Sequence, residues 1–304
     1  MQIGTGTHRY EWMSNWAKLP EGKAFGYTHG VVVDSDQNVH IFNQSPDALC
    51  TFDREGKFIR SWGNEFAKGA HGLYLSKEGD TDFLFLCDYE LQKVQKRSLD
   101  GKLILDIPIP PRPDIYRDPK TYKPTDTCVA PNGDIYLFDG YGQPFVHRHD
   151  KSGKYLQSIG GLGSEPGKLN CPHAGNVDLR HGEAELYVAD RGNNRIQVFT
   201  LDGRHKRFVT NDQQRPCNFA WYKDEVYIPD LDARLTILDK NDKLIAHLGA
   251  NPEAPKTEGW PNIQAKLQEG NFNSPHQCRV NPFTGDVFVV EWISTGRVTK
   301  LRRL

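Results

Sequence analysis

The sequence lacks a long apolar run and a surplus of charge of either sign. No apolar stretch approaches the ~20 residues of a membrane-spanning helix, so we expect no membrane partner. The 304 residues include 38 Lys and Arg and 39 Asp and Glu, a formal net charge of −1. Nucleic-acid-binding proteins carry a basic excess or stripe, so we expect no nucleic-acid partner. Residues 1–6 lack the features of a secretory signal, which predicts a cytoplasmic protein, although a trimmed signal would leave the same sequence.

Paired cysteine motifs are also missing. None of the six cysteines forms a C-x-x-C pair, which excludes a zinc ribbon and a thioredoxin motif. Their wide spacing is not that of a small disulfide scaffold. We therefore expect six free thiols, at Cys50, Cys87, Cys128, Cys171, Cys217 and Cys278.

What the sequence does have is repetition. Six segments share an aliphatic and aromatic strand that ends in an acidic or polar residue: 38–43, 82–88, 134–139, 185–190, 225–230 and 286–291. An alternating strand, a turn such as Asp100-Gly101 and a closing strand follow. Asp-Gly between alternating strands is a strong hairpin signal. About four short strands per ~40–55 residues is the period of a propeller blade, so the sequence predicts an all-β, six-bladed β-propeller.

The sixth copy stops before its fourth strand, whereas residues 10–19 form an extra strand-like stretch ahead of the first copy. We therefore expect residues 1–20 to close the last blade, because an open blade would leave an exposed strand edge. Residues 1–304 then form a single domain. Two long insertions, 108–123 and 251–273, are expected to act as lids, with Arg112, Tyr116 and Trp260 as candidate substrate contacts.

The first strand of each blade lies nearest the propeller axis, and its start carries one residue per copy. These residues are His29, His71, Asp126, His173, Asn218 and His276, so four of the eleven histidines share one register. His71, His173 and His276 belong to alternate blades and should lie about 120° apart around the axis. Three histidines with one open position are typical of a catalytic zinc site. The alternative is that each histidine is structural and hydrogen-bonded in a wet channel.

Further candidates surround this register. His29, Asp126, Asn218, Gln44 and Gln277 are possible additional contacts to the metal or the substrate.

Residues just after the second strands should lie on the same face as the histidines, and Tyr141 and Arg191 are the best placed for chemistry. A tyrosine beside a divalent cation can lose its proton and act as a base. An arginine binds carboxylate or developing negative charge, and Asp139 would help to orient that group. The structural alternatives are a packing role for Tyr141 and a salt bridge from Arg191 to Asp190 or Asp139.

The repeats resemble NHL repeats. The segments 124–141, 171–173 and 189–197 resemble the peptidyl-α-hydroxyglycine α-amidating lyase family, whose members are six-bladed propellers. The resemblance implies a catalytic zinc held by His71, His173 and His276, with Tyr141 as the base and Arg191 as an active-site arginine. Gln44 and its neighbour Asn43 stand where that family has a second arginine, and Gln277 stands where it has an aspartate of a calcium site. The family's peptide substrate and its calcium are therefore not carried over.

The leading hypothesis is a metal-dependent lyase, with a divalent metal such as zinc as Lewis acid and a hydroxylated small molecule as substrate. The first alternative is a metal-dependent hydrolase or hydratase acting on a sugar-like or lactone-like substrate, as in gluconolactonase-like propellers. The second is an NHL-type binding scaffold, which predicts a basic, aromatic face that the balanced charge does not support. The sequence gives no indication of the oligomeric state.

Overall fold

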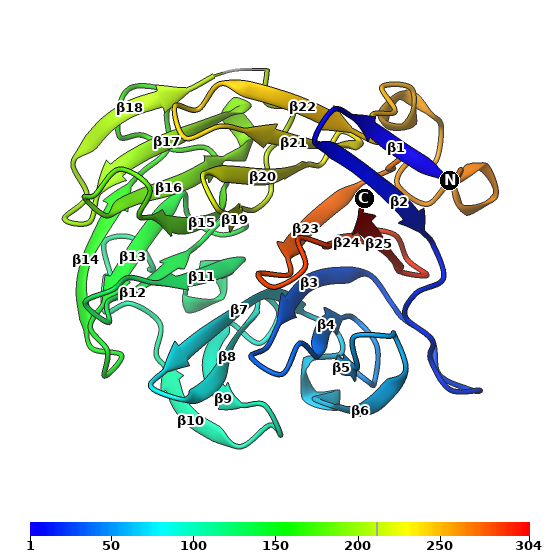
Figure 1. Ribbon diagram of the computed structural model, residues 1–304. Coiled ribbons are helices and arrows are strands. Elements are labelled where there is room, and N and C mark those ends of the chain that lie inside the picture. The colour runs from blue at the N-terminus through cyan, green and yellow to red at the C-terminus, as the bar shows by residue number, and fades with distance from the viewer. Residues whose placement is uncertain (211) are drawn as a thin grey trace. The chain divides into compact units, whose positions relative to one another are not determined.

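The computed structural model describes residues 1–210 and 212–304, which form six antiparallel sheets (Figure 1). The chain divides into two compact units. We call Met1–Ala67 with Cys217–Leu304 the terminal unit, and Lys68–Pro216 the middle unit. Among the described residues, no helix has the length and apolar character needed to cross a membrane.

The middle unit contains three four-stranded sheets, each built from strands that follow one another in the chain. The first contains β7 (Ala70–Glu78), β8 (Thr81–Asp88), β9 (Lys93–Ser98) and β10 (Leu103–Ile107). The second contains β11 (Asp126–Val129), β12 (Ile135–Phe138), β13 (Phe145–His149) and β14 (Tyr155–Gly160). The third contains β15 (Pro172–Asp178), β16 (Glu185–Asp190), β17 (Arg195–Thr200) and β18 (His205–Val209).

The terminal unit contains two four-stranded sheets and one five-stranded sheet. The four-stranded sheets contain β3 (Thr28–Val33), β4 (Val39–Asn43), β5 (Leu49–Phe52) and β6 (Phe58–Trp62), and β19 (Ala220–Tyr222), β20 (Glu225–Asp230), β21 (Arg234–Leu238) and β22 (Leu244–Leu248). The five-stranded sheet has the order β1 (Gln2–Thr5), β2 (His8–Met13), β25 (Arg297–Arg303), β24 (Val287–Glu291) and β23 (Pro275–Val280).

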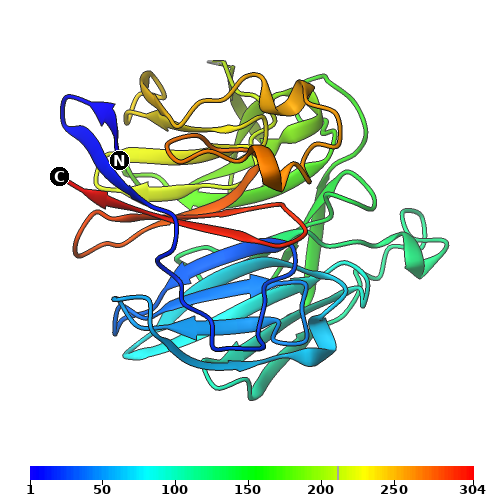
Figure 2. The same ribbon diagram turned by 90° about the vertical axis from the view of Figure 1, so that its right-hand side faces the viewer.

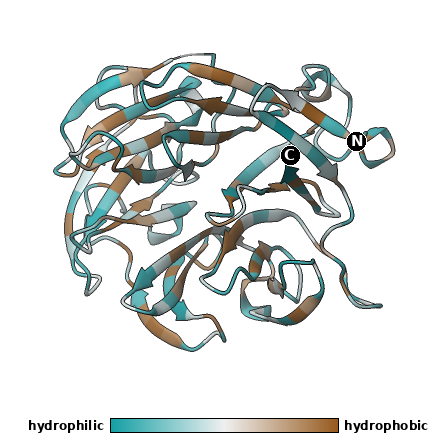
Figure 3. Ribbon diagram, in the orientation of Figure 1, coloured by the Kyte–Doolittle hydropathy of each residue, from teal (hydrophilic) through white to brown (hydrophobic). Residues whose placement is uncertain are grey.

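Each sheet carries one copy of the sequence repeat, and the strands that match the six aliphatic and aromatic segments are β4, β8, β12, β16, β20 and β24. β16 and β20 have the predicted bounds, and the other four differ by one residue at one or both ends. This agreement follows from the short apolar run in each second strand, which has polar residues at its ends. Figure 3 shows the changes of hydropathy along the strands. The predicted fold class, an all-β six-bladed propeller, is confirmed.

The N-terminal strand completes the last blade, as predicted. β2 pairs antiparallel with β25, with Tyr10 opposite Arg303 and Trp12 opposite Leu301, and Figure 2 shows the N-terminal hairpin beside the C-terminal strand. Two details differ from the prediction. β2 ends at Met13 rather than near residue 19, and the hairpin has an additional outer strand, β1, that pairs with β2.

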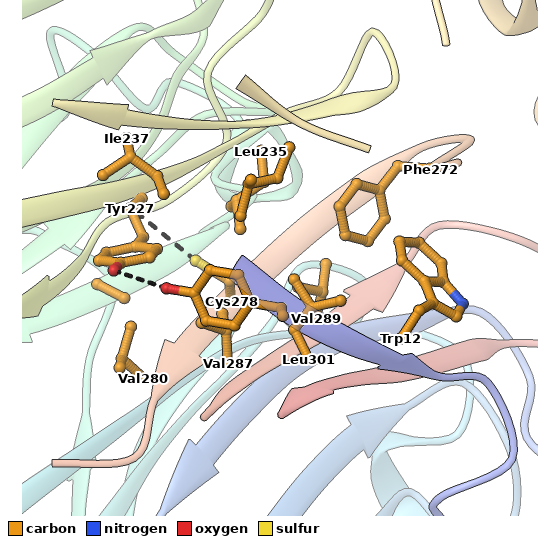
Figure 4. Packing of buried hydrophobic residues seen from close by; sticks show 13 residues of the cluster. Trp12, Tyr227, Leu235, Ile237, Phe272, Cys278, Val280, Val287, Val289 and Leu301 are labelled. Atoms are coloured by element: carbon orange, nitrogen blue, oxygen red, sulfur yellow. Dashed lines mark hydrogen bonds between the residues drawn. The ribbon is translucent and has the colours of Figure 1, made fainter. Parts of the chain in front are cut away.

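Apolar side chains from neighbouring sheets fill the interior of each unit. In the terminal unit, one cluster contains side chains from β2, β20, β21, β23, β24 and β25 (Figure 4). Two polar contacts lie within it: a hydrogen bond of 3.0 Å between the hydroxyls of Tyr10 and Tyr227, and one from Sγ of Cys278 to the backbone carbonyl of Tyr227 at 3.6 Å. In the middle unit, Tyr136 and Phe138 pack with Val188 and Phe199 from the next sheet.

The two insertions are folded segments with short 3-10 turns. Segment 108–123 contains η2 (Pro119–Thr121), and segment 251–273 contains η4 (Ala254–Lys256) and η5 (Gln264–Lys266). Two further turns are η1 (Asn64–Phe66) and η3 (Arg191–Asn193). Tyr116 and Tyr122 of the first insertion are buried, so this segment is packed against its own unit.

Candidate functional site

The four histidines that share one register also share a backbone feature. The strand pairing shifts register at His29 in β3, His71 in β7, His173 in β15 and His276 in β23. Such bulges leave a residue out of the ladder and redirect its side chain. The remaining two positions have no such shift: Asp126 pairs regularly with Phe138 at the start of β11, and Asn218 precedes β19. All six side chains are buried, with 1–7% exposed.

In the middle unit, Tyr141 lies between two of these histidines. Its hydroxyl is 3.0 Å from Nε2 of His71 and 3.4 Å from Nε2 of His173. The two imidazole ring centres are 5.0 Å apart. Tyr141 itself is 37% exposed, whereas both histidines are buried.

The tautomer of His71 follows from its second contact. Its Nδ1 lies 2.6 Å from the backbone carbonyl of Thr125. Because a carbonyl oxygen only accepts, Nδ1 carries the proton and the neutral ring presents the lone pair of Nε2 toward Tyr141. Histidines that bind metals are commonly held in this way by a carbonyl on the opposite nitrogen.

The loop that carries Tyr141 has no room for side chains on either flank. A Cβ added to Gly140 would lie 2.5 Å from Oγ1 of Thr125, and one added to Gly142 would lie 2.1 Å from the carbonyl oxygen of Thr121. The backbone of the loop is therefore fixed by close contact with both neighbouring segments, which limits where the Tyr141 hydroxyl can lie.

The Asp139 carboxylate accepts hydrogen bonds from both sides of the same loop. One carboxylate oxygen accepts from the backbone amide of Lys123, and the other accepts from the amide of Gln143 and the hydroxyl of Tyr116, each at 2.7 Å. Burial raises the pKa of Asp139 to about 6. The structure thus gives this carboxylate a holding role, and the predicted role in orienting substrate charge stays a prediction.

A cation and a second tyrosine border the Tyr141 ring. The guanidinium of Arg191 lies over it, 5.2 Å from the ring centre, a distance typical of cation–π contact. The ring of Tyr89 lies 5.6 Å from that of Tyr141 and 5.8 Å from that of His71. The neighbouring Asp190 has its own guanidinium partner, with Nε of Arg195 at 2.7 Å.

The terminal unit holds the other two histidines of the register. Nδ1 of His276 donates to the backbone carbonyl of His29 at 2.9 Å, so Nε2 again presents its lone pair. Nδ1 of His29 lies 3.4 Å from that Nε2. Gln277 accepts a hydrogen bond from the amide of Val31, and the amide of Gln44 donates to the carbonyl of Tyr27. His71 and His173 belong to the middle unit and His276 to the terminal unit, so the three-histidine set stays a sequence-based prediction.

The three insertion residues proposed as substrate contacts have partners inside their own units. Arg112 bonds to Asp114 and Tyr155, and the hydroxyl of Tyr116 lies between Asp139 and His147. Nε1 of Trp260 donates to the carbonyl of Asn273. The Thr125 carbonyl and His147 were not predicted from the sequence. A backbone carbonyl leaves no signal in the sequence, and His147 looks like any polar residue in an alternating strand.

The sequence of this chain is similar to those of several known proteins. No family model matches the chain. NHL repeat-containing protein 3 of Homo sapiens is 26% identical over 289 residues, covering 91% of this chain and 79% of that protein. Peptidyl-alpha-hydroxyglycine alpha-amidating lyase 1 of Drosophila melanogaster is 25% identical over 258 residues, covering 78% of this chain and 45% of the lyase. The chain is similar to NHL-repeat proteins and to amidating lyases.

Solved structures share the fold at lower identity. A streptogramin B lyase matches with a TM-score of 0.66 and 14% identity, covering 96% of this chain and 97% of that one. A gluconolactonase from Xanthomonas campestris matches with a TM-score of 0.68 and 13% identity, covering 99% and 94%. Identities this low show the fold alone. Because a lyase and a lactonase share it, the function must be inferred from the site.

Proposed function

We propose that this chain is a lyase that cleaves a hydroxylated small molecule by elimination, with Tyr141 as the base. The observation that carries the proposal is the position of the Tyr141 hydroxyl between Nε2 of His71 and Nε2 of His173, with the guanidinium of Arg191 over the Tyr141 ring. The similarity to amidating lyases over 78% of the chain supports the reaction class.

The donor atoms suit a zinc-like cation. His71 has its Nδ1 proton held by a carbonyl, which leaves Nε2 as a lone-pair donor beside His173. Imidazole nitrogens are typical zinc ligands, whereas calcium takes oxygen ligands. We therefore propose a divalent metal held by His71 and His173, with His276 added from the sequence prediction, and no calcium. A bound metal would supply Lewis-acid polarisation of the substrate hydroxyl.

The residues of the chain then divide the work. Tyr141, as phenolate, takes the proton from the substrate hydroxyl. The carbon that bears this oxygen becomes a carbonyl as its bond to the leaving group breaks, and the leaving group departs with the electron pair and then takes up a proton. Arg191 favours the phenolate and holds negative charge on the substrate. The loop contacts of Asp139 and Gly142 keep the Tyr141 oxygen in place.

Metal content is the first test. We expect the purified wild type to bind about one equivalent of zinc or a similar metal, and His71→Ala, His173→Ala and His276→Ala each to weaken binding. His205→Ala is the matched control, because this histidine lies on β18 of the middle unit, outside the site. A wild type that takes up no metal, or a His71/His173 double variant that binds it normally, would overturn the proposed metal site.

Product analysis separates the lyase from its alternatives. Hydroxy acids and sugar derivatives are screened, and the products are examined for a new carbonyl and for oxygen from ¹⁸O-labelled water. We expect a carbonyl product without the label, and Tyr141→Phe should lower turnover by about 10²–10⁴-fold. Incorporated label would instead establish a hydrolase or hydratase. Absence of both turnover and metal would favour the NHL-type binding scaffold.

A further inference from the structure

A chain of hydrogen bonds in the middle unit runs from Asp139 toward the surface. The hydroxyl of Tyr116 lies 2.7 Å from Oδ2 of Asp139 and 2.6 Å from Nε2 of His147. Nδ1 of His147 lies 2.8 Å from Oγ of Ser158, which is 2.9 Å from the hydroxyl of Tyr155. Asp139 and His147 are fully buried and Tyr116 nearly so, whereas Ser158 and Tyr155 are half-buried. These hydrogen bonds therefore form a continuous path from the protein interior to its surface.

The next blade shows what is unusual here. Asp190 ends β16, and it is neutralised by Arg195, the first residue of β17, and bonded by Gln197, the third. In β13 the first and third residues are Phe145 and His147. Among the described residues, no guanidinium bonds to Asp139 as Arg195 does to its counterpart, and Asp139 receives instead the neutral hydroxyl of Tyr116 from insertion 108–123.

The direction of each hydrogen bond follows when Asp139 is ionised. A carboxylate only accepts, so the hydroxyl of Tyr116 donates to it. The Tyr116 oxygen then accepts from Nε2–H of His147, and Nδ1 of the neutral ring accepts from the hydroxyl of Ser158. Every polar atom along this path has a partner.

The same atoms are equally satisfied with one more proton and every bond reversed. Protonated Asp139 donates to Tyr116, which donates to Nε2 of His147, and Nδ1–H donates to Ser158. We propose that Asp139, Tyr116, His147 and Ser158 hold one exchangeable proton as a unit, and that its uptake reverses the chain and switches the tautomer of His147.

The surroundings decide where the extra proton resides. Burial raises the pKa of Asp139 to about 6 and lowers that of His147 to about 3, so the carboxyl takes the proton and the imidazole stays neutral. The other charged or titratable groups facing the chain are Arg112 and Tyr122 of the insertion, Cys87 of β8, His149 of β13 and Tyr155 of β14. Arg112 carries charge near pH 6. His149 stays neutral there, because burial lowers its pKa to about 4, and burial raises the pKa of the Tyr122 phenol and of the Cys87 thiol well above their usual values.

Protonation of Asp139 affects how firmly the loop of Tyr141 is held. Oδ2 of Asp139 accepts from Tyr116 and also from the amide of Gln143, two residues beyond Tyr141. Hydrogen bonds to an ionised acceptor are roughly twice as strong as those to a neutral one, so loss of the charge loosens this support. Tyr116 and His147 are thus positioning residues for Tyr141. The proton switch itself stands whether or not Tyr141 is a catalytic base.

Nitrogen NMR of ¹⁵N-histidine-labelled protein tests the switch without any substrate. The two tautomers have distinct ¹⁵N shifts, and His147→Gln identifies the signal. As pH falls from 7.5 to 4.5 we expect His147 to change from the Nε2–H to the Nδ1–H form with a midpoint near 6, without becoming an imidazolium. A single tautomer throughout, or an imidazolium forming near pH 6.5, would overturn the proposal.

Two tyrosines of the same insertion provide matched variants. Tyr116→Phe removes the hydroxyl that links Asp139 to His147, so the tautomer of His147 should no longer change near pH 6. Tyr122→Phe removes a fully buried hydroxyl that has no hydrogen-bond partner among the described residues, and the switch should persist. A switch that survives in Tyr116→Phe contradicts the chain, and if that variant fails to fold, the wild-type titration still decides.

Discussion

Replacing Trp12 with alanine should destabilise the chain through the last blade. Trp12 lies on β2, the strand that closes the five-stranded sheet, and it is 3% exposed. Its ring centre lies 4.8 Å from that of Phe272, and the guanidinium of Arg297 lies 5.3 Å above it. The indole therefore joins the N-terminal strand to both the insertion 251–273 and β25.

The decrease in the free energy of unfolding expected for Trp12→Ala can be estimated in two ways. Burying about 200 Å² of aromatic surface at ~25 cal/mol per Å² gives about 5 kcal/mol, and measured Trp→Ala changes in cores cost about 3–5 kcal/mol. The unfolding entropy of 304 residues is about 0.6 kcal/mol per degree near the midpoint. We therefore expect Tm to fall by about 5–8 °C.

The assay is thermal unfolding followed by circular dichroism and calorimetry. Leu244→Ala, at an exposed position of β22 in the same unit, is the control and should shift Tm by less than about 1 °C. If Trp12→Ala melts within about 2 °C of the wild type, then β2 is dispensable, and the inference that the N-terminus must close the last blade is refuted.

Two further predictions concern the packing around the site. Ellman's reagent should react with one thiol in the native chain, the half-buried Cys171, and with all six after unfolding, because burial raises the pKa of Cys50 and Cys278 to about 12; Cys171→Ser should abolish the native reaction, and a second fast thiol would contradict the packing. Gly142→Ala should cost about 1–3 kcal/mol in calorimetry, since its Cβ would lie 2.1 Å from the carbonyl oxygen of Thr121; an unchanged Tm would show that the loop is not held as described.

The repeated part of the fold could be predicted because the sequence contains six copies of the same strand pattern. Each second strand is a short run of apolar side chains bounded by acidic or polar residues, so β16 and β20 have the predicted bounds. The ends of these strands also explain why the residue type repeats. Asp190 accepts from the amide of Asn170, and Glu291 accepts from the amide of Asn273, so both carboxylates tie down the segment that enters the first strand.

The features that occur once could not be read in this way. β1 has no counterpart in other blades, and only its pairing with β2 defines it. Trp16 fits a strand pattern in the sequence, yet β2 ends before it and its ring packs between Phe52 and Phe288. Tertiary contacts decided both cases, and such contacts leave no local periodicity.

The candidate site follows the same division. The register of the histidines is visible in the sequence because six copies can be aligned, whereas the bulges that turn these side chains out of the ladder are backbone irregularities without a residue signature. The repeat then makes single departures informative. At the position where one blade of the middle unit places Arg195 against Asp190, the preceding blade has Phe145 and leaves Asp139 to Tyr116. A buried carboxylate without a counter-charge costs stability. Asp139 is such a carboxylate, and it lies beside the loop of Tyr141. We therefore expect this blade to have a functional role in addition to its role in the fold.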